Sequence, residues 1–170
     1  MTRFGAVMAT YASTMAIVVS AFLHPAPKLI WNASASVPMG LYALHRPRPL
    51  HVGDIVVARP PEPLASYLDR RRSLPDGVPL VKPIAALSGQ TVCRHGGLVS
   101  VDGVVLAVAQ DRDRRGRRLP VWQGCHVLGA GDIFLMNPAE PDSLDGRYFG
   151  PLTTAVILGS ATPLWIPKAR

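Results

Sequence analysis

Asn-Ala-Ser-Ala-Ser-Val-Pro-Met-Gly-Leu-Tyr, at residues 32–42, is a small-residue segment with two serines that follows a long uncharged run. Taken alone, such a segment is most often a loop, because serine and proline favour turns. Two later stretches give it another meaning. Residues 80–84 (LVKPI) place one lysine in an apolar run typical of a strand, and residues 142–151 (DSLDGRYFGP) contain a serine followed by an acid and an arginine. A serine and a lysine can together supply a nucleophile and its base.

Lys82 is the candidate base. A serine hydroxyl is a weak nucleophile until a neighbouring base removes its proton. A lysine serves as that base only when burial or a nearby cation makes its neutral form accessible. No other charge lies within residues 78–87, and in a strand Lys82 shares a face with Leu80 and Ile84. An edge-strand lysine that reaches out to solvent remains the alternative.

Ser36 is the candidate nucleophile, two residues before Pro38. If the segment is extended, Ser34 and Ser36 lie on one face. The backbone N–H of Ser36, helped by the Ser34 hydroxyl, is then placed to hold the oxyanion of a tetrahedral intermediate.

The three stretches together resemble the type I signal peptidases of the serine-lysine class, peptidase family S26, over most of residues 34–151. The resemblance implies that Ser36 is the nucleophile and Lys82 the base, with Ser34 in the oxyanion hole. It also implies that Ser143 hydrogen-bonds the Lys82 ammonium and that Asp145 pairs with Arg147. From the residues alone, a purely structural ion pair between Asp145 and Arg147 is equally natural, because positions i and i+2 share one side of an extended segment.

Departures from the housekeeping enzymes point to the conjugative-transfer, TraF-like branch of this family. Val37 replaces the usual methionine after the nucleophile, Pro83 follows the lysine where arginine is usual, and Gly146 follows Asp145 where serine is usual. Asn32 before the serines also matches that branch. The resemblance implies a membrane-anchored serine endopeptidase that processes a pilin precursor, and it leaves hydrolysis and head-to-tail circularisation both open.

Composition predicts a mostly β protein. Seventeen prolines and fifteen glycines among short Val, Ile and Leu runs favour strands and turns in a chain of 170 residues. The resemblance implies the antiparallel β-sheet fold that signal peptidases share with LexA-like self-cleaving repressors. Strands are expected at 42–44, 54–58, 78–87, 91–95, 98–101, 104–109, 121–122, 125–128, 133–136, 152–158 and 164–166, with a short helix near 64–71.

Residues 4–23 carry no charge, and a helix of about 20 residues spans the hydrocarbon core of a bilayer. We therefore expect a membrane anchor at residues 1–24 and a peptidase domain at residues 25–170. A removed signal peptide and a buried core helix are the alternatives. The resemblance places the anchor in the bacterial inner membrane and the domain in the periplasm.

Cys93 and Cys125 lie on two expected strands. In an oxidising compartment a disulfide between them would add about 3–4 kcal/mol in the loop-entropy account. Free thiols remain open, as does a metal site with His95 and His126, although the adjacent Cys125 and His126 would point to opposite faces of a strand. We expect neither a metal nor another cofactor.

The net charge of +7 is concentrated at residues 70–72 and 112–118. Such runs are most often solvated loops, and no aromatic residues are interleaved as a stacking platform for single strands requires. We expect no nucleic-acid partner, and no catalytic residue within residues 60–76.

Three other functions were weighed against the peptidase of the transfer apparatus. A non-catalytic scaffold of that apparatus and a general type I signal peptidase both remain alternatives. A self-cleaving repressor is disfavoured, because its helix-turn-helix would occupy the place of the uncharged run.

Overall fold

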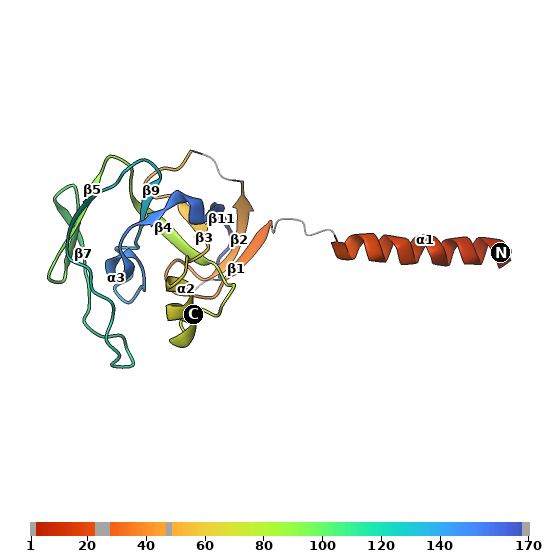
Figure 1. Ribbon diagram of the computed structural model, residues 1–170, viewed down its shortest axis with the longest axis horizontal. Coiled ribbons are helices and arrows are strands. Elements are labelled where there is room, and N and C mark those ends of the chain that lie inside the picture. The colour runs from red at the N-terminus through yellow and green to blue at the C-terminus, as the bar shows by residue number, and fades with distance from the viewer. Residues whose placement is uncertain (1–2, 23–27, 47–48, 168–170) are drawn as a thin grey trace.

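The computed structural model describes residues 3–22, 28–46 and 49–167, and its first element is a long helix, α1 (Arg3–Phe22). The helix is long and apolar enough to cross a membrane, and none of that span is buried in the protein. This excludes the alternative of a buried core helix. Figure 1 shows α1 apart from the β-rich domain. The predicted boundary at residues 24 and 25 lies outside the described residues.

The hydroxyl groups of α1 are bonded to its own backbone. Thr10, Ser13 and Thr14 each donate to the carbonyl oxygen four residues earlier, at 2.8–3.0 Å. Such bonds reduce the cost of taking polar side chains into hydrocarbon, where backbone and hydroxyl groups find no water. The polar residues of this span are therefore compatible with a membrane crossing.

The described part of the domain consists of two antiparallel sheets and short helices, so the predicted mostly β class is confirmed (Figure 1). The seven-stranded sheet has the order β1-β2-β11-β3-β4-β9-β10, and the four-stranded sheet the order β7-β6-β5-β8. The bounds in the first sheet are β1 Leu29–Asn32, β2 Gly40–His45, β3 Ile55–Ala58, β4 Leu80–Leu87, β9 Asp132–Leu135, β10 Leu152–Thr153 and β11 Ile157–Trp165. Those in the second are β5 Thr91–His95, β6 Leu98–Val101, β7 Val104–Val108 and β8 Gly124–Val127, and the helices are α2 Leu64–Arg70 and α3 Gly146–Phe149, with a 3-10 turn at Thr154–Val156.

β4 is an interior strand of the seven-stranded sheet. It pairs with β3 and β9 and is buried on both faces over most of its length, which explains its near-continuous apolar sequence. The largest buried cluster joins the two sheets, because Ala86 of β4 and Phe134 of β9 pack with Val92 and Val99 of the smaller sheet. Lys82 thus lies in a strand that is paired on both edges and mostly buried.

Five local predictions were wrong. The strand expected at 152–158 is interrupted by a 3-10 turn at Thr154–Val156, and the last strand covers Ile157–Trp165 instead of 164–166. β1 was not expected, because four residues give too short a periodic signal. Residues 34–37 form a turn instead of an extended segment, and residues 146–149 form one turn of helix. Residues 121–122 are not in a strand; Trp122 instead donates its indole N–H to the Gly146 carbonyl at 2.9 Å.

Cys93 and Cys125 face each other across β5 and β8 and are joined by a disulfide. His95 Nε2 lies 3.6 Å from the Cys125 sulfur. His126 instead packs edge-on against Trp122, with ring centroids 5.4 Å apart. The cysteines line neither of the cavities described below, so the disulfide has its effect on the smaller sheet and not at the site.

Gly146 is a position where a side chain does not fit. A Cβ there would lie 2.6 Å from Phe134 Cε2 and 2.8 Å from the Leu135 carbonyl oxygen. We expect Gly146→Ala to destabilise the domain by about 2 kcal/mol, which would lower Tm by about 5 °C for a chain of this size. Thermal unfolding of the full chain in detergent, followed by circular dichroism, measures this.

Gly129→Ala is the matched control, because a Cβ there meets its nearest neighbour, Asp132 Oδ2, at an ordinary 3.4 Å. Equal Tm values for the two variants would contradict the close packing at Gly146.

Candidate active site

Lys82 lies at the centre of the candidate site. Its β4 backbone pairs with Val56 of β3, and its side chain is only 2% exposed. The Lys82 ammonium donates to Ser36 Oγ at 2.6 Å and to Ser143 Oγ at 2.8 Å. Two hydroxyls from segments far apart in the sequence therefore converge on one buried nitrogen. Ser36 is partly exposed and Ser143 is buried.

Burial lowers the pKa of Lys82 from 10.5 to about 8. The Asp145 carboxylate acts to raise that pKa and the Arg147 guanidinium to lower it further, both less strongly than burial. About a tenth of the lysine is then neutral at pH 7. Lys82 can accept the Ser36 proton without strongly alkaline conditions.

Asn32, the last residue of β1, organises the turn that carries Ser36. Its amide nitrogen donates to the Ser34, Val37 and Pro38 carbonyls at 2.8, 3.0 and 3.2 Å. Its Oδ1 accepts from the Ser34 backbone N–H at 3.1 Å and from the Ser34 hydroxyl at 2.9 Å. These bonds outweigh the extended geometry expected from the sequence, because they satisfy the backbone of the turn.

Ser34 and Ser36 both line the same cavity, although the segment is not extended. In the part of the chain that the structure describes, the Ser36 backbone N–H makes no hydrogen bond, so it is available to an oxyanion. The Ser34 hydroxyl is bonded to Asn32 and would have to rotate to join it.

Asp145 and Arg147 form a buried ion pair behind the serine-lysine group. Their side chains are 0% and 1% exposed, with Arg147 Nη2 2.8 Å from Asp145 Oδ2 and Nε 2.9 Å from Oδ1. Asp145 also caps α3 by accepting from the Arg147 backbone N–H. Either ion alone would be costly to bury, so the two are retained as a unit.

The ion pair holds the loop that leads to Ser143. Arg147 Nη2 donates to the carbonyl oxygens of Asn137 and Glu140, each at 2.7 Å, and Asp145 Oδ2 accepts from the Asn137 N–H at 3.1 Å. Asn137 in turn donates its side-chain amide to the Ser36 carbonyl at 2.7 Å. The position of the serine is thereby linked to the loop that positions Ser143.

The sequence did not identify Asn137 or Arg94 as part of this arrangement. Arg94 on β5 is 2% exposed, and its guanidinium donates to the Gly96 and Arg147 carbonyls while lying 5.9 Å from the centre of the Tyr148 ring. The available signal was the alternation of strand faces, which puts Arg94 on the inward face with Val92.

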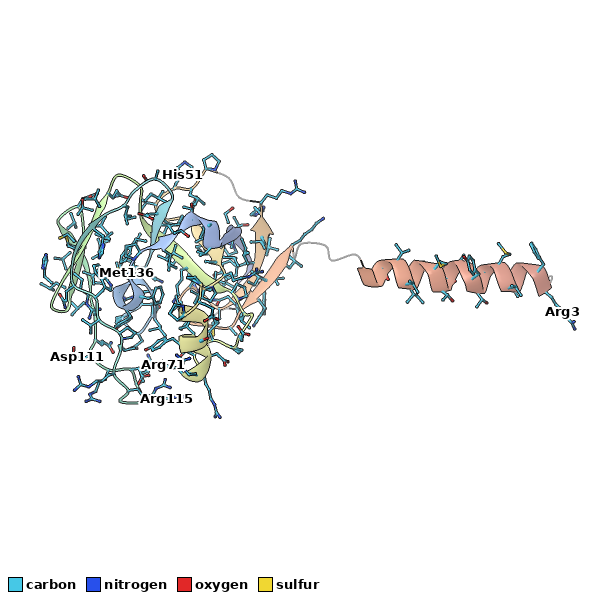
Figure 2. All side chains as sticks on the ribbon, in the orientation of Figure 1. Arg3, His51, Arg71, Asp111, Arg115 and Met136 are labelled. Carbon is cyan, nitrogen blue, oxygen red and sulfur yellow. A yellow bond between two sulfur atoms is a disulfide. The ribbon has the colours of Figure 1, made fainter. Side chains whose placement is uncertain are left out.

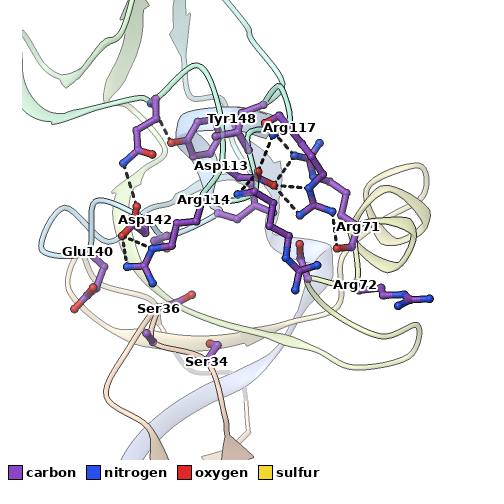
Figure 3. A pocket seen from close by; sticks show the side chains of 17 residues that line it. Ser34, Ser36, Arg71, Arg72, Asp113, Arg114, Arg117, Glu140, Asp142 and Tyr148 are labelled. Atoms are coloured by element: carbon purple, nitrogen blue, oxygen red, sulfur yellow. Dashed lines mark hydrogen bonds and ion pairs between the residues drawn. The ribbon is translucent and has the colours of Figure 1, made fainter.

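Two cavities meet at Ser36. The first, of about 410 Å³, is mainly apolar. It is lined by β1 and by residues 78–82, which include Lys82, and we call it the apolar groove. The second, of about 340 Å³, is lined by arginines from both basic runs, as Figure 3 shows above Ser34 and Ser36. Those runs were expected to be solvated loops, and most of their arginines are exposed. The sequence did not predict that Arg71, Arg72 and three arginines of the later run line a cavity beside Ser36.

Comparisons with known proteins identify the family of this chain. The family model described as signal peptidase, peptidase S26, matches residues 1–166. A probable conjugal transfer protein TraF of Sinorhizobium fredii is 36% identical over 140 residues, covering 76% of this chain and 73% of that protein. The conjugal transfer protein TraF of Agrobacterium fabrum is 33% identical over 146 residues, covering 79% and 80%. The crystal structure of a signal peptidase I from Enterococcus faecalis is 17% identical, with a TM-score of 0.40 over 68% of this chain and 99% of that one.

A stability measurement tests the burial of Lys82. In the folded chain its pKa is about 8, against about 10.5 when it is unfolded, so the unfolded chain holds the proton more tightly. The full destabilisation is present below pH 8 and disappears as pH rises from 8 to 10.5. We expect Lys82→Met to raise the free energy of unfolding at pH 7 by up to about 3 kcal/mol.

Urea unfolding at pH 7 and pH 10 measures both values, and Lys28→Met, at an exposed lysine, is the control. The account predicts that the gain from Lys82→Met shrinks at pH 10. A loss of stability at pH 7, or a gain that does not change with pH, would contradict it.

Proposed function

The chain belongs to the signal peptidase family, peptidase S26, and we propose that it is a membrane-anchored serine endopeptidase with Ser36 and Lys82 as its catalytic dyad. The observation that carries this proposal is the 2.6 Å contact between Lys82 Nζ and Ser36 Oγ. Burial of the lysine, with a pKa near 8, makes that contact productive for proton transfer.

The reaction begins when Ser36 Oγ attacks the scissile carbonyl carbon and Lys82 Nζ takes the hydroxyl proton. The developing oxyanion is held by the Ser36 backbone N–H and by the Ser34 hydroxyl after it rotates away from Asn32. Lys82 then gives the proton to the leaving amine, the C–N bond breaks, and an ester of Ser36 remains. Ser143 holds the lysine nitrogen in place throughout, through its 2.8 Å hydrogen bond.

Lys82 then acts as base a second time. It activates a water molecule that hydrolyses the ester, which releases a linear product and restores Ser36. If a peptide amine attacks in place of water, the products are joined by a new peptide bond. Attack by the substrate's own N-terminus would give a circular product.

The apolar groove suits an extended substrate. β1 is at the edge of its sheet, and β4 pairs with β3 over Leu80 to Pro83 but with β9 only from Ile84 onward. The other side of β4 near Lys82 is therefore open to an added strand, whose backbone bonds give affinity while side-chain pockets give specificity. The segment before the scissile bond occupies this groove and presents small side chains to it.

The substrate that we propose is a pilin precursor of a conjugative transfer system. Relatives that are 33–36% identical carry the name conjugal transfer protein TraF, which supports a role in transfer. The departures at Val37, Pro83 and Gly146 from the housekeeping pattern support the same branch.

An apolar rim supports the placement of the domain at the inner membrane on the periplasmic side. Trp31 and Trp165 are 55% and 56% exposed with ring centroids 5.9 Å apart, and Leu29 and Leu164 are also exposed. Tryptophan is enriched at membrane–water interfaces, and this rim lies on β1, the first strand after α1, and on the end of β11. The disulfide is suited to an oxidising compartment.

Co-expression with a pilin precursor tests the dyad. We expect the wild-type chain to yield mature product and both Ser36→Ala and Lys82→Ala to yield none, because each removes one partner of the proton transfer. Intact mass spectrometry identifies the products, and a mass one water below the linear product identifies a circle.

Ser100→Ala and Lys28→Ala are the controls, because neither residue lines a cavity at the site. If the dyad variants process the precursor as the wild type does, the chain is better described as a scaffold of the transfer apparatus that kept the fold.

The dependence of activity on pH tests the role of the lysine. Because only the neutral amine accepts the serine proton, log kcat/KM should rise by about one per pH unit below pH 8 and level off above it. Initial rates with a cleavable peptide, measured from pH 6 to pH 9, give this profile. A flat profile over that range would mean that another group is the base.

A further inference from the structure

The cavity of about 340 Å³ beside Ser36 is strongly basic. Arg71 and Arg72 reach it from the end of α2, and Arg114, Arg115 and Arg117 reach it from the loop between β7 and β8 (Figure 3). We call the cavity formed by these five residues the arginine pocket. Figure 2 shows Arg71 and Arg115 on the same side of the domain, although they lie far apart in the sequence.

Asp113 joins the two basic runs into one wall. Its Oδ2 accepts from Arg71 Nη2 at 2.8 Å and from Arg117 Nε at 2.7 Å, and its Oδ1 accepts from two backbone N–H groups of the loop. Arg117 Nη1 also donates to the Arg71 carbonyl at 2.9 Å. Burial acts to raise the pKa of Asp113, but the bonds from Arg117 and Arg71 hold it well below its usual range. The Asp113 carboxylate, which joins Arg71 and Arg117, therefore stays ionised near neutral pH.

Arg72 and Arg115 are not neutralised by this wall. Both are exposed, and within the described ranges neither has an acidic side chain at ion-pair distance. Arg114 is paired with Asp142, through Nε at 3.0 Å, and Glu140 lies across from Arg72 on the other side of Ser36 in Figure 3. The five arginines outnumber the three acids of the lining, so a net positive charge faces the cavity.

The pocket continues the path of the substrate. It shares Ser34, Ser36, Ser73 and Leu144 with the apolar groove. A chain that runs through the groove and past Ser36 therefore enters the arginine pocket. Since an extended chain advances about 3.4 Å per residue, the first few residues after the scissile bond lie there.

We propose that the arginine pocket binds a carboxylate within the first few substrate residues after the scissile bond, through Arg72 and Arg115. This inference rests on the proposed peptidase function. The guanidinium group pairs with a carboxylate in a two-pronged geometry. The carboxylate is either an Asp or Glu side chain or, in a substrate that ends within those residues, its free C-terminus.

The lining of the arginine pocket favours a ligand with a single negative charge over a polyanion. Asp113, Asp142 and Glu140 line the same cavity and would repel the dense charge of a nucleic acid. The lining of the cavity also contains no exposed aromatic platform for a base.

Cleavage of defined peptides by the full chain in non-ionic detergent tests the proposal. Each peptide is internally quenched, has alanine at the first and third positions before the scissile bond, and carries Glu or Gln at one position after it. The C-terminus is either free or amidated. We expect Glu to lower KM about threefold relative to Gln at one position, and Arg72→Gln/Arg115→Gln to remove that preference.

Arg70→Gln/Arg118→Gln is the control, because it removes the same charge from the same two segments at exposed residues that do not line the cavity. A preference that follows the free C-terminus and not Glu identifies the terminal carboxylate as the ligand. Equal KM values for all peptides, with cleavage still abolished by Ser36→Ala, would overturn this inference and leave the peptidase function standing.

If no peptide is cleaved, the result counts against the proposed peptidase function. A binding measurement then tests the arginine pocket separately. Fluorescence anisotropy of a labelled Glu peptide should then show weaker binding to Arg72→Gln/Arg115→Gln than to the control variant. Equal affinities for the two variants would contradict the proposal that Arg72 and Arg115 bind the carboxylate.

Discussion

The burial of one ammonium group beside a serine hydroxyl is the interaction on which the rest of this structure depends. Lys82 is 2% exposed, and burial brings its pKa down to about 8. A charge in that position destabilises the fold, so the surrounding structure has to hold it in place. Strand β4 fixes the backbone of Lys82, and the hydroxyl groups of Ser36 and Ser143 accept hydrogen bonds from its ammonium group. A base that works near neutral pH is the gain that offsets this cost.

The supporting groups form a connected set around that lysine. Asp145 and Arg147 hold the loop at residues 137–141, and Asn137 carries the connection to the Ser36 carbonyl. Gly146 lets this pair approach Phe134 and Leu135 closely, since a Cβ would collide with both. The glycine found where related enzymes usually have serine is therefore a packing requirement in this chain. The smaller sheet contributes through Arg94, which bonds to the Arg147 carbonyl and so joins the two sheets near the site.

The sequence was sufficient for much of the fold, because most strands are apolar runs bounded by glycine turns, as at residues 91–95 and 98–101. Lys82, Ser36 and Ser143 could be singled out because they stand in three stretches that together resemble the signal peptidases. The turn at residues 34–37 could not, since it depends on five hydrogen bonds from one side chain, Asn32. The position of the basic runs beside the site could not be predicted either, because residues 70–72 and 112–118 are joined only in space, through Asp113.

The pKa of Lys82 is the most direct measure of the central claim. The chain has three lysines, Lys28, Lys82 and Lys168, so labelling lysine with ¹³C at Cε gives a spectrum that Lys28→Met and Lys82→Met assign. Titration of the full chain in detergent should show the Lys82 signal moving near pH 8. If the Lys82 signal instead moves above pH 10, Lys82 is not a buried base and the dyad does not operate as described.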